Sequence, residues 1–190
     1  SNRPSSPRVL PRGQDLPDTD GKPMDSDWVC DQVRIYLIDP LRRHLAFTGR
    51  QAYVSGDSFV YYLDPNHSKV RRLGPDFYVV LGGEPRGQTK WVAWEEGDRL
   101  PTTVIEFLSP TTEERDRGKK FCVYRDIFKT QDYFLVNPDT LAIEAYHLVR
   151  GHYVASTPGP DGWYWIESLR LFLGCVNGWM RFRTPEGQIL

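Results

Sequence analysis

The chain has 190 residues, of which 39% are hydrophobic and 26% charged, with a formal net charge of −1. This length and composition are typical of one soluble globular domain with a sizeable core. The near-neutral charge excludes a globally basic nucleic-acid binder, so any site for a polyanion must be a local patch. No membrane partner is expected, because no run of about 18 apolar residues occurs.

The three cysteines, Cys30, Cys122 and Cys175, are far apart and form no CxxC pair. This usage argues against a disulfide framework and against a zinc ribbon. Because the N-terminus also lacks an apolar signal core, we expect a cytoplasmic protein.

The first part of the chain predicts an arm followed by a helix. Residues 1–24 are rich in Pro, Ser, Asp and Gly, which predicts an extended or disordered arm, and residues 25–190 are expected to form a single domain. In the segment 25–47, Cys30, Val33 and Leu37 recur at helical spacing. Pro40 is expected to kink this helix or to split it.

Strand-like sequences follow the helix. The runs 52–64 and 74–83 predict strands separated by a polar turn around 65–72, while 84–101 has loop composition. The later predicted elements are a strand at 102–109, a helix at about 113–128, a strand at 132–140, a hairpin over 141–156 and further C-terminal strands. This order predicts an α/β or α+β fold with a mixed central sheet flanked by helices.

Glu106 interrupts an otherwise apolar strand, "TVIEFLS". Alternation places Glu106 on one face of the sheet with Val104 and Leu108, and Ile105 and Phe107 on the other. A buried carboxylate there would need a charged partner or a metal ion, whereas a glutamate at the end of the strand could be half solvated.

The helix that follows would point one lysine inward. On a helical wheel, Lys120 lies within about 40° of the apolar stripe that includes Tyr124, whereas Lys119 lies about 140° away. Asp116 lies one turn before Lys120 on the same side. Alternatively, Lys120 could extend past the aromatic face to water or pair with Asp116.

Asp76 begins the strand "DFYVVL" after Gly74-Pro75. A carboxylate in this position could be only a turn acceptor. If Asp76 and Glu106 converge near Lys120, the set suits a phosphodiesterase dependent on Mg²⁺ (or Mn²⁺), because Mg²⁺ prefers hard oxygen ligands. Nearby arginines could supply local attraction for phosphate: Arg71, Arg72, Arg115 and Arg117.

The pattern "IE.LSP.T...D...K...Y" (105–124), with "PDFYVV" before it and "DYFLVNP" after it, resembles the Uma2 (DUF820) family of endonucleases. That family belongs to the PD-(D/E)XK restriction-endonuclease-like superfamily. The resemblance implies a restriction-endonuclease-like mixed sheet with additional C-terminal strands, and nucleic acid, in particular DNA, as the substrate.

The resemblance also implies roles for individual residues. Asp76 and Glu106 would be metal ligands, together with the backbone carbonyl of Phe107. Leu108 stands where the superfamily's lysine is usual, and Lys120 would supply that lysine from the following helix. Supporting roles would fall to three further residues: Asp116, Tyr124 and Asp31. By analogy, a homodimer is expected.

Two other hypotheses remain open. The chain could be a nuclease-like module that binds nucleic acid or protein with weak or no catalysis. It could also be a structural dimer in which the acids and the lysine form a buried ion network.

Overall fold

The computed structural model describes residues 9–21, 26–111 and 113–190. A mixed six-stranded sheet lies at its centre, with the strand order β1-β4-β6-β7-β8-β9. Its strands are Ala52–Ser55 (β1), Phe77–Leu81 (β4), Thr103–Phe107 (β6), Asp132–Val136 (β7), Ile143–Val149 (β8) and His152–Ser156 (β9). Strands β6 and β7 are parallel and the other neighbours are antiparallel, which confirms the predicted α+β fold with a mixed sheet.

The first helix covers 27–47 and does not split at Pro40. It consists of α1 (Asp27–Asp31), a π-helical section (Gln32–Ile38) and α2 (Asp39–Phe47). Ser26 caps its N-terminus, since the Oγ atom accepts a hydrogen bond from the N–H of Val29 at 3.2 Å. Pro40 lies where the π-helical section passes into α2, inside a helix that continues to Phe47, so the predicted split is wrong and the kink stays a prediction.

The second helix covers 113–128, as predicted. It consists of α3 (Glu113–Arg115), a π-helical section (Asp116–Lys120), α4 (Phe121–Val123) and a final π-helical section (Tyr124–Phe128). It ends at Lys129, which adopts a left-handed conformation with φ 54°. Among the described residues, no helix is long and apolar enough to span a membrane.

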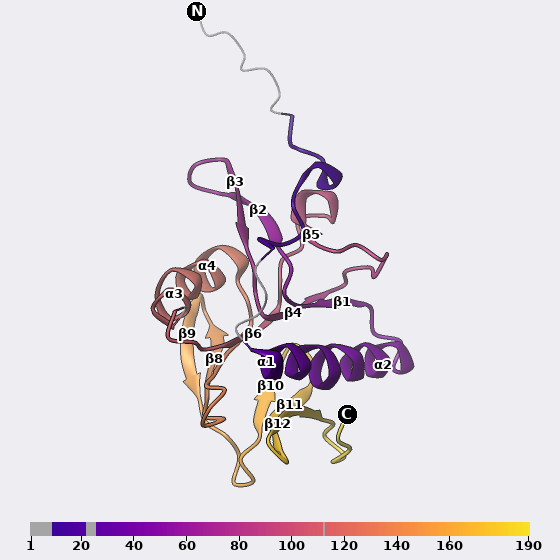
Figure 1. The fold of residues 1–190 in the computed structure, drawn as a ribbon, viewed down its shortest axis with the longest axis vertical. Coiled ribbons are helices and arrows are strands. Elements are labelled where there is room, and N and C mark those ends of the chain that lie inside the picture. The colour runs from indigo at the N-terminus through magenta and orange to yellow at the C-terminus, as the bar shows by residue number, and fades with distance from the viewer. Residues whose placement is uncertain (1–8, 22–25, 112) are drawn as a thin grey trace, which may run out of the picture.

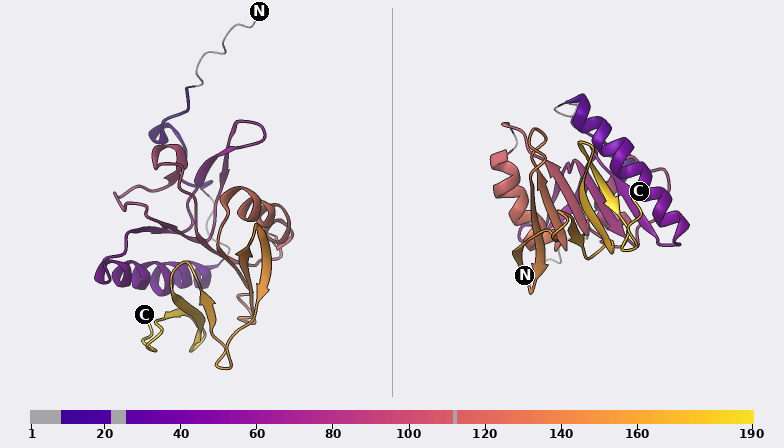
Figure 2. Two further views of the ribbon diagram at one scale, coloured as in Figure 1. Left: turned by 180° about the vertical axis from the view of Figure 1, so that it is seen from behind. Right: turned by 90° about the horizontal axis from the view of Figure 1, so that it is seen from below.

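The two helices lie on opposite sides of the central sheet (Figure 2). The second helix packs against one face through a cluster that includes Tyr124 and Val104. On the other face, Leu37 and Leu41 of the first helix pack with Ile105 and with the C-terminal sheet. That sheet consists of β10 (Tyr164–Ile166), β11 (Leu171–Val176) and β12 (Trp179–Arg183), in agreement with the predicted C-terminal strands.

The prediction for 52–72 is partly wrong, because this region contributes to a separate three-stranded sheet. The run 52–64 divides at Gly56-Asp57 into β1 and β2 (Val60–Asp64), and β2 pairs with β3 (Lys69–Leu73) rather than with β1. Asp57 adopts a positive φ of 47°, which turns the chain out of the central sheet. Part of the expected polar turn is therefore a strand, and the β2–β3 hairpin projects beside the second helix (Figure 1).

The described N-terminal residues 9–21 pack against this three-stranded sheet. Its third strand, β5 (Trp91–Val92), lies in the region with loop composition and is followed by a 3-10 turn at Ala93–Glu95. Residues 9–21 lie against this region. The indole N–H of Trp94 donates a hydrogen bond to the carbonyl oxygen of Pro11 at 3.1 Å, and the hydroxyl of Tyr61 donates one to the carbonyl oxygen of Pro17 at 2.8 Å. The rest of the expected arm, 1–8 and 22–24, lies outside the described residues.

Candidate active site

Glu106 lies at the centre of the molecule and is completely buried. It is the fourth residue of β6, between β4 and β7, and all five residues of this strand are buried. The neighbours Val104 and Leu108 belong to the cluster under the second helix, whereas Ile105 and Phe107 belong to the opposite cluster. The alternation predicted from the sequence is therefore confirmed, and a half-solvated glutamate is excluded.

The second helix brings two donors to one oxygen of Glu106. The Nζ atom of Lys120 lies 2.9 Å from Oε1 of Glu106, and the hydroxyl of Tyr124 lies 2.6 Å from the same atom. A spacing of four residues puts Lys120 and Tyr124 on one face of the helix. Lys120 is only 4% exposed, while Lys119 is exposed, so the helical wheel identified the inward lysine correctly.

Two hydrogen bonds connect Asp76 with the end of β6, one to Glu106 and one to Phe107. The N–H of Asp76 donates to Oε2 of Glu106 at 3.2 Å, and the N–H of Phe107 donates to Oδ2 of Asp76 at 2.7 Å. The antiparallel register of β4 and β6, in which Phe77 faces Ile105, sets this arrangement. The backbone of Asp76 thus lies against the carboxylate of Glu106, and the convergence of the two carboxylates beside Lys120 stays a prediction.

The oxygens of Asp76 and Glu106 suit a hard divalent cation. Mg²⁺ is commonly bound through one or two carboxylates and retains several waters. Within the described residues, no three acidic, histidine or cysteine side chains come together as a metal-binding group, so further ligands would have to be waters or a backbone carbonyl. This donor set fits Mg²⁺ or Mn²⁺, and ligation by the carbonyl of Phe107 stays a prediction.

A tight turn holds the backbone of Asp76. The N–H of Asp57 lies 3.2 Å from the carbonyl oxygens of both Pro75 and Asp76. A Cβ atom on Gly56 would lie 2.1 Å from the carbonyl oxygen of Asp76, so only glycine permits this approach. Burial, with a smaller contribution from Asp20, raises the pKa of Asp57. Sequence reasoning missed this support, although the "SGDS" stretch carried a turn signal.

One of the predicted supporting acids, Asp31, is not connected with this cluster within the described residues. Asp31 is exposed at the end of α1, and the contacts of the described residues do not connect it with Glu106. Its position about 100° from the apolar stripe explains this exposure. The side chain of Asp116 lies outside the described residues, as does that of Arg115, so the pairing of Asp116 with Lys120 stays a prediction.

Arg117 links the second helix to the central sheet. Its two terminal nitrogens each donate to the carboxylate of Glu144 on β8 at 2.6 Å, and its Nε atom donates to Glu113 at 2.9 Å. The hydrogen bonds to Glu144 and Glu113 raise the pKa of Arg117. The hydrogen bond from Arg117 lowers the pKa of Glu144. The charge expected to attract phosphate is therefore compensated by two carboxylates.

The chain is similar to known proteins over much of its length. The Uma2 family model, described as "Putative restriction endonuclease", matches residues 22–174. The chain is also 37% identical over 73 residues to the uncharacterized protein slr1290 of Synechocystis sp. strain PCC 6803. That match covers 38% of this chain and 35% of the relative, so it spans about a third of each protein.

Proposed function

This chain belongs to the Uma2 family, and on that premise we propose that it is an endonuclease that hydrolyses phosphodiester bonds in nucleic acid, in particular DNA. The observation that carries the proposal is the buried carboxylate of Glu106, which accepts hydrogen bonds from Lys120 and from the backbone N–H of the second acid, Asp76. An acidic pair with an inward lysine is the set of groups that such hydrolysis requires.

In this proposal Asp76 and Glu106 hold Mg²⁺ or Mn²⁺. When bound, the cation supplies Lewis-acid stabilisation of the charge that develops on the phosphate and makes water more acidic. The buried Lys120 orients the attacking water or stabilises charge on the phosphate as a point cation. Tyr124 is a positioning residue, since its hydroxyl fixes the same oxygen of Glu106 that Lys120 contacts.

Water is the nucleophile in the overall reaction. A bond forms between the water oxygen and phosphorus, the bond from phosphorus to one ester oxygen breaks, and the leaving oxygen acquires a proton. The products are a phosphomonoester and an alcohol, so no oxidant or further co-reactant is needed. The proposal includes a homodimer, which could address both strands of a duplex, and a cytoplasmic location.

A second candidate function is a binding module with weak or no catalysis. It is favoured by the hydrogen bonds at Glu106, because both carboxylate oxygens already accept hydrogen bonds from the protein. A cation would have to share these oxygens with Lys120, Tyr124 or the N–H of Asp76. In this alternative the ion pair stabilises the fold, and nucleic acid is bound but not cut.

Cleavage of covalently closed circular DNA tests the proposal, because only an endonuclease can open a circle. We expect the wild type to nick or linearise the DNA with Mg²⁺ or Mn²⁺ and to stop when EDTA is added. Asp76→Asn and Glu106→Gln should each reduce cleavage by at least about 100-fold. Asp139→Asn, which changes an exposed acid on the β7–β8 turn, is the matched control. Unchanged cleavage by both site variants would refute the assignment.

A further inference from the structure

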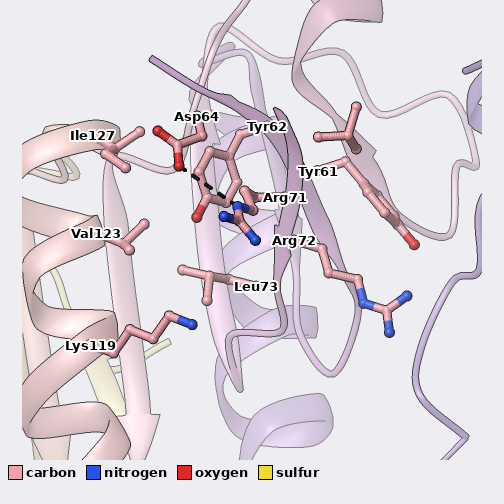
Figure 3. A pocket seen from close by; sticks show the side chains of 10 residues that line it. Tyr61, Tyr62, Asp64, Arg71, Arg72, Leu73, Lys119, Val123 and Ile127 are labelled. Carbon is pink, nitrogen blue, oxygen red and sulfur yellow. Dashed lines mark ion pairs between the residues drawn. The ribbon is translucent and has the colours of Figure 1, made fainter. Parts of the chain in front are cut away.

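A cavity of about 530 Å³ lies between the β2–β3 hairpin and the second helix. Tyr62, Arg71 and Leu73 line it from the hairpin, and Lys119, Val123 and Ile127 line it from the helix (Figure 3). Its volume lies within the range of roughly 300–1,000 Å³ that is typical of small-molecule sites. The space is suited to one nucleotide and is too small for a base pair with its two backbones.

The lining combines an apolar floor with cations at the rim. Leu73, Val123 and Ile127 supply the apolar surface, and Lys119 extends from the helix toward the hairpin strand that carries Arg71 (Figure 3). The side chain of Arg71 is 50% exposed, and its nearest acid, Asp64, lies 3.7 Å from its Nε atom.

The acid beside the cavity, Asp64, is anionic and pairs with Arg71. Asp64 accepts hydrogen bonds from the ring of His67 at 3.1 Å and from the N–H of Asn66 at 2.9 Å, and these contacts lower its pKa. Arg72 points to the other side of the hairpin, with its guanidinium 4.4 Å from the ring centroid of Phe59 (Figure 3). Arg71 and Lys119 outnumber Asp64 at the rim, so the rim is net positive, although the whole chain has a net charge of −1.

Both walls of the cavity continue directly into the candidate active site. On the hairpin side, β3 ends at Leu73, and Gly74-Pro75 leads to Asp76. On the helix side, Lys119 precedes Lys120, whose ammonium contacts Glu106. A ligand seated between Arg71 and Lys119 is thus held by the two chain segments that carry Asp76 and Lys120.

We propose that this cavity binds one unpaired nucleotide of the substrate strand next to the bond that is cut. Its base lies on the apolar floor and its phosphates contact Arg71 and Lys119. The inference rests on the proposed function and specifies its substrate: a single strand, or a duplex with an unpaired nucleotide, is preferred over a fully paired duplex. Positive grooves with aromatic side chains on which bases stack commonly hold single strands, and Tyr62 is an aromatic residue of this lining.

Binding measured without cleavage tests this inference separately from the chemistry. We would titrate a labelled single strand of about 15 nucleotides in EDTA and follow its fluorescence anisotropy. The double variant Arg71→Ala/Lys119→Ala should weaken binding about tenfold and reduce the salt slope by about 1.4, because each phosphate contact on a single strand contributes roughly 0.7. The double variant Arg34→Ala/Arg43→Ala is the matched control, since it removes two exposed cations from the first helix.

Each outcome decides the inference. A loss confined to the cavity variant, with tighter binding of the single strand than of a duplex of the same sequence, supports it. Equal losses in both variants, a preference for the duplex or no binding by the wild type would overturn it. Cleavage that depends on Glu106 while the cavity variant binds normally would refute the cavity and leave the proposed function intact. Binding that depends on the cavity, without any cleavage, would support the cavity and refute the proposed function.

Discussion

Lys120 and Glu106 form a buried ion pair, with 2.9 Å between Nζ and Oε1 and side-chain exposures of 5% and 0%. The pair joins the second helix to the central strand β6. A buried pair contributes little net stability compared with apolar residues of the same shape, but loss of one partner leaves an uncompensated charge. The same two side chains therefore contribute to the folded structure and to the proposed chemistry.

Removal of Lys120 alone should be costly. We expect Lys120→Met to lower the free energy of unfolding by about 3–5 kcal/mol, because it leaves the carboxylate of Glu106 buried without its cation. The double variant Glu106→Leu/Lys120→Met should recover much of this loss. Urea denaturation measures both, and Lys119→Met is the matched control, with an expected change within about 0.5 kcal/mol. Equal effects of the two lysine variants would contradict the ion pair.

Gly56 should tolerate no side chain, because its Cβ would approach the carbonyl oxygen of Asp76 to 2.1 Å and Val33 to 2.8 Å. We expect Gly56→Ala to destabilise the protein by at least about 2 kcal/mol and to weaken divalent-cation binding by displacing Asp76. Gly118 in the second helix has no atom within 4 Å of such a Cβ. Gly118→Ala should therefore stabilise by about 0.5–1 kcal/mol. Thermal melts that rank the two variants in the opposite order would refute this account of the turn.

Asp132 at the start of β7 should anchor the C-terminal sheet to the central sheet. Its buried carboxylate accepts hydrogen bonds from the N–H groups of Ser168 and Glu167 at 2.8 and 3.2 Å, and lies 3.0 Å from Nδ1 of His147. Asp132→Ala should cost about 2–4 kcal/mol, because two backbone donors lose their partner. Denaturant unfolding provides the measurement. A loss no larger than that of the exposed Asp139→Ala would show that this connection is unimportant.

The contact between Glu144 and Arg117 predicts a dependence of stability on pH. The pKa of Glu144 is lowered from its ordinary value of 4.5, first by the hydrogen bond from Arg117. A depressed folded-state pKa gives stability that is present above the unfolded pKa and is lost as the pH falls through the folded value. The melting temperature of the wild type should therefore exceed that of Glu144→Gln near neutral pH, and the difference should shrink below pH 4.5. A difference that does not vary with pH would contradict this contribution.

Local periodicity was sufficient to predict the central strands, the second helix and the inward position of Lys120. Each of these features depends on residues close together in the sequence. The two-residue period of a strand and the 3.6-residue period of a helix therefore predict them directly. The proximity of the Asp76 backbone to Glu106 could be inferred because the two residues lie at neighbouring ends of adjacent strands. The resemblance to the Uma2 family added the expected role of each acid.

Long-range pairing could not be predicted in the same way. The separation of β1 from β2 depends on the turn at Gly56 and on pairing of β2 with β3 and β5, which alternation within 52–64 does not report. The docking of 9–21 depends on hydrogen bonds to Trp94 and Tyr61, far along the chain. Likewise, nothing near Arg117 in the sequence indicated that Glu144 would take both of its terminal nitrogens.

Calorimetric titration of Mn²⁺ into the wild type, Asp76→Asn and Glu106→Gln tests the central claim most directly. We expect the wild type to bind and each variant to lose at least about tenfold in affinity, because each removes one charged ligand from a site with two. Circular dichroism should first establish that both variants are folded. Equal binding by all three proteins would contradict the assignment of Asp76 and Glu106 as the metal-binding pair.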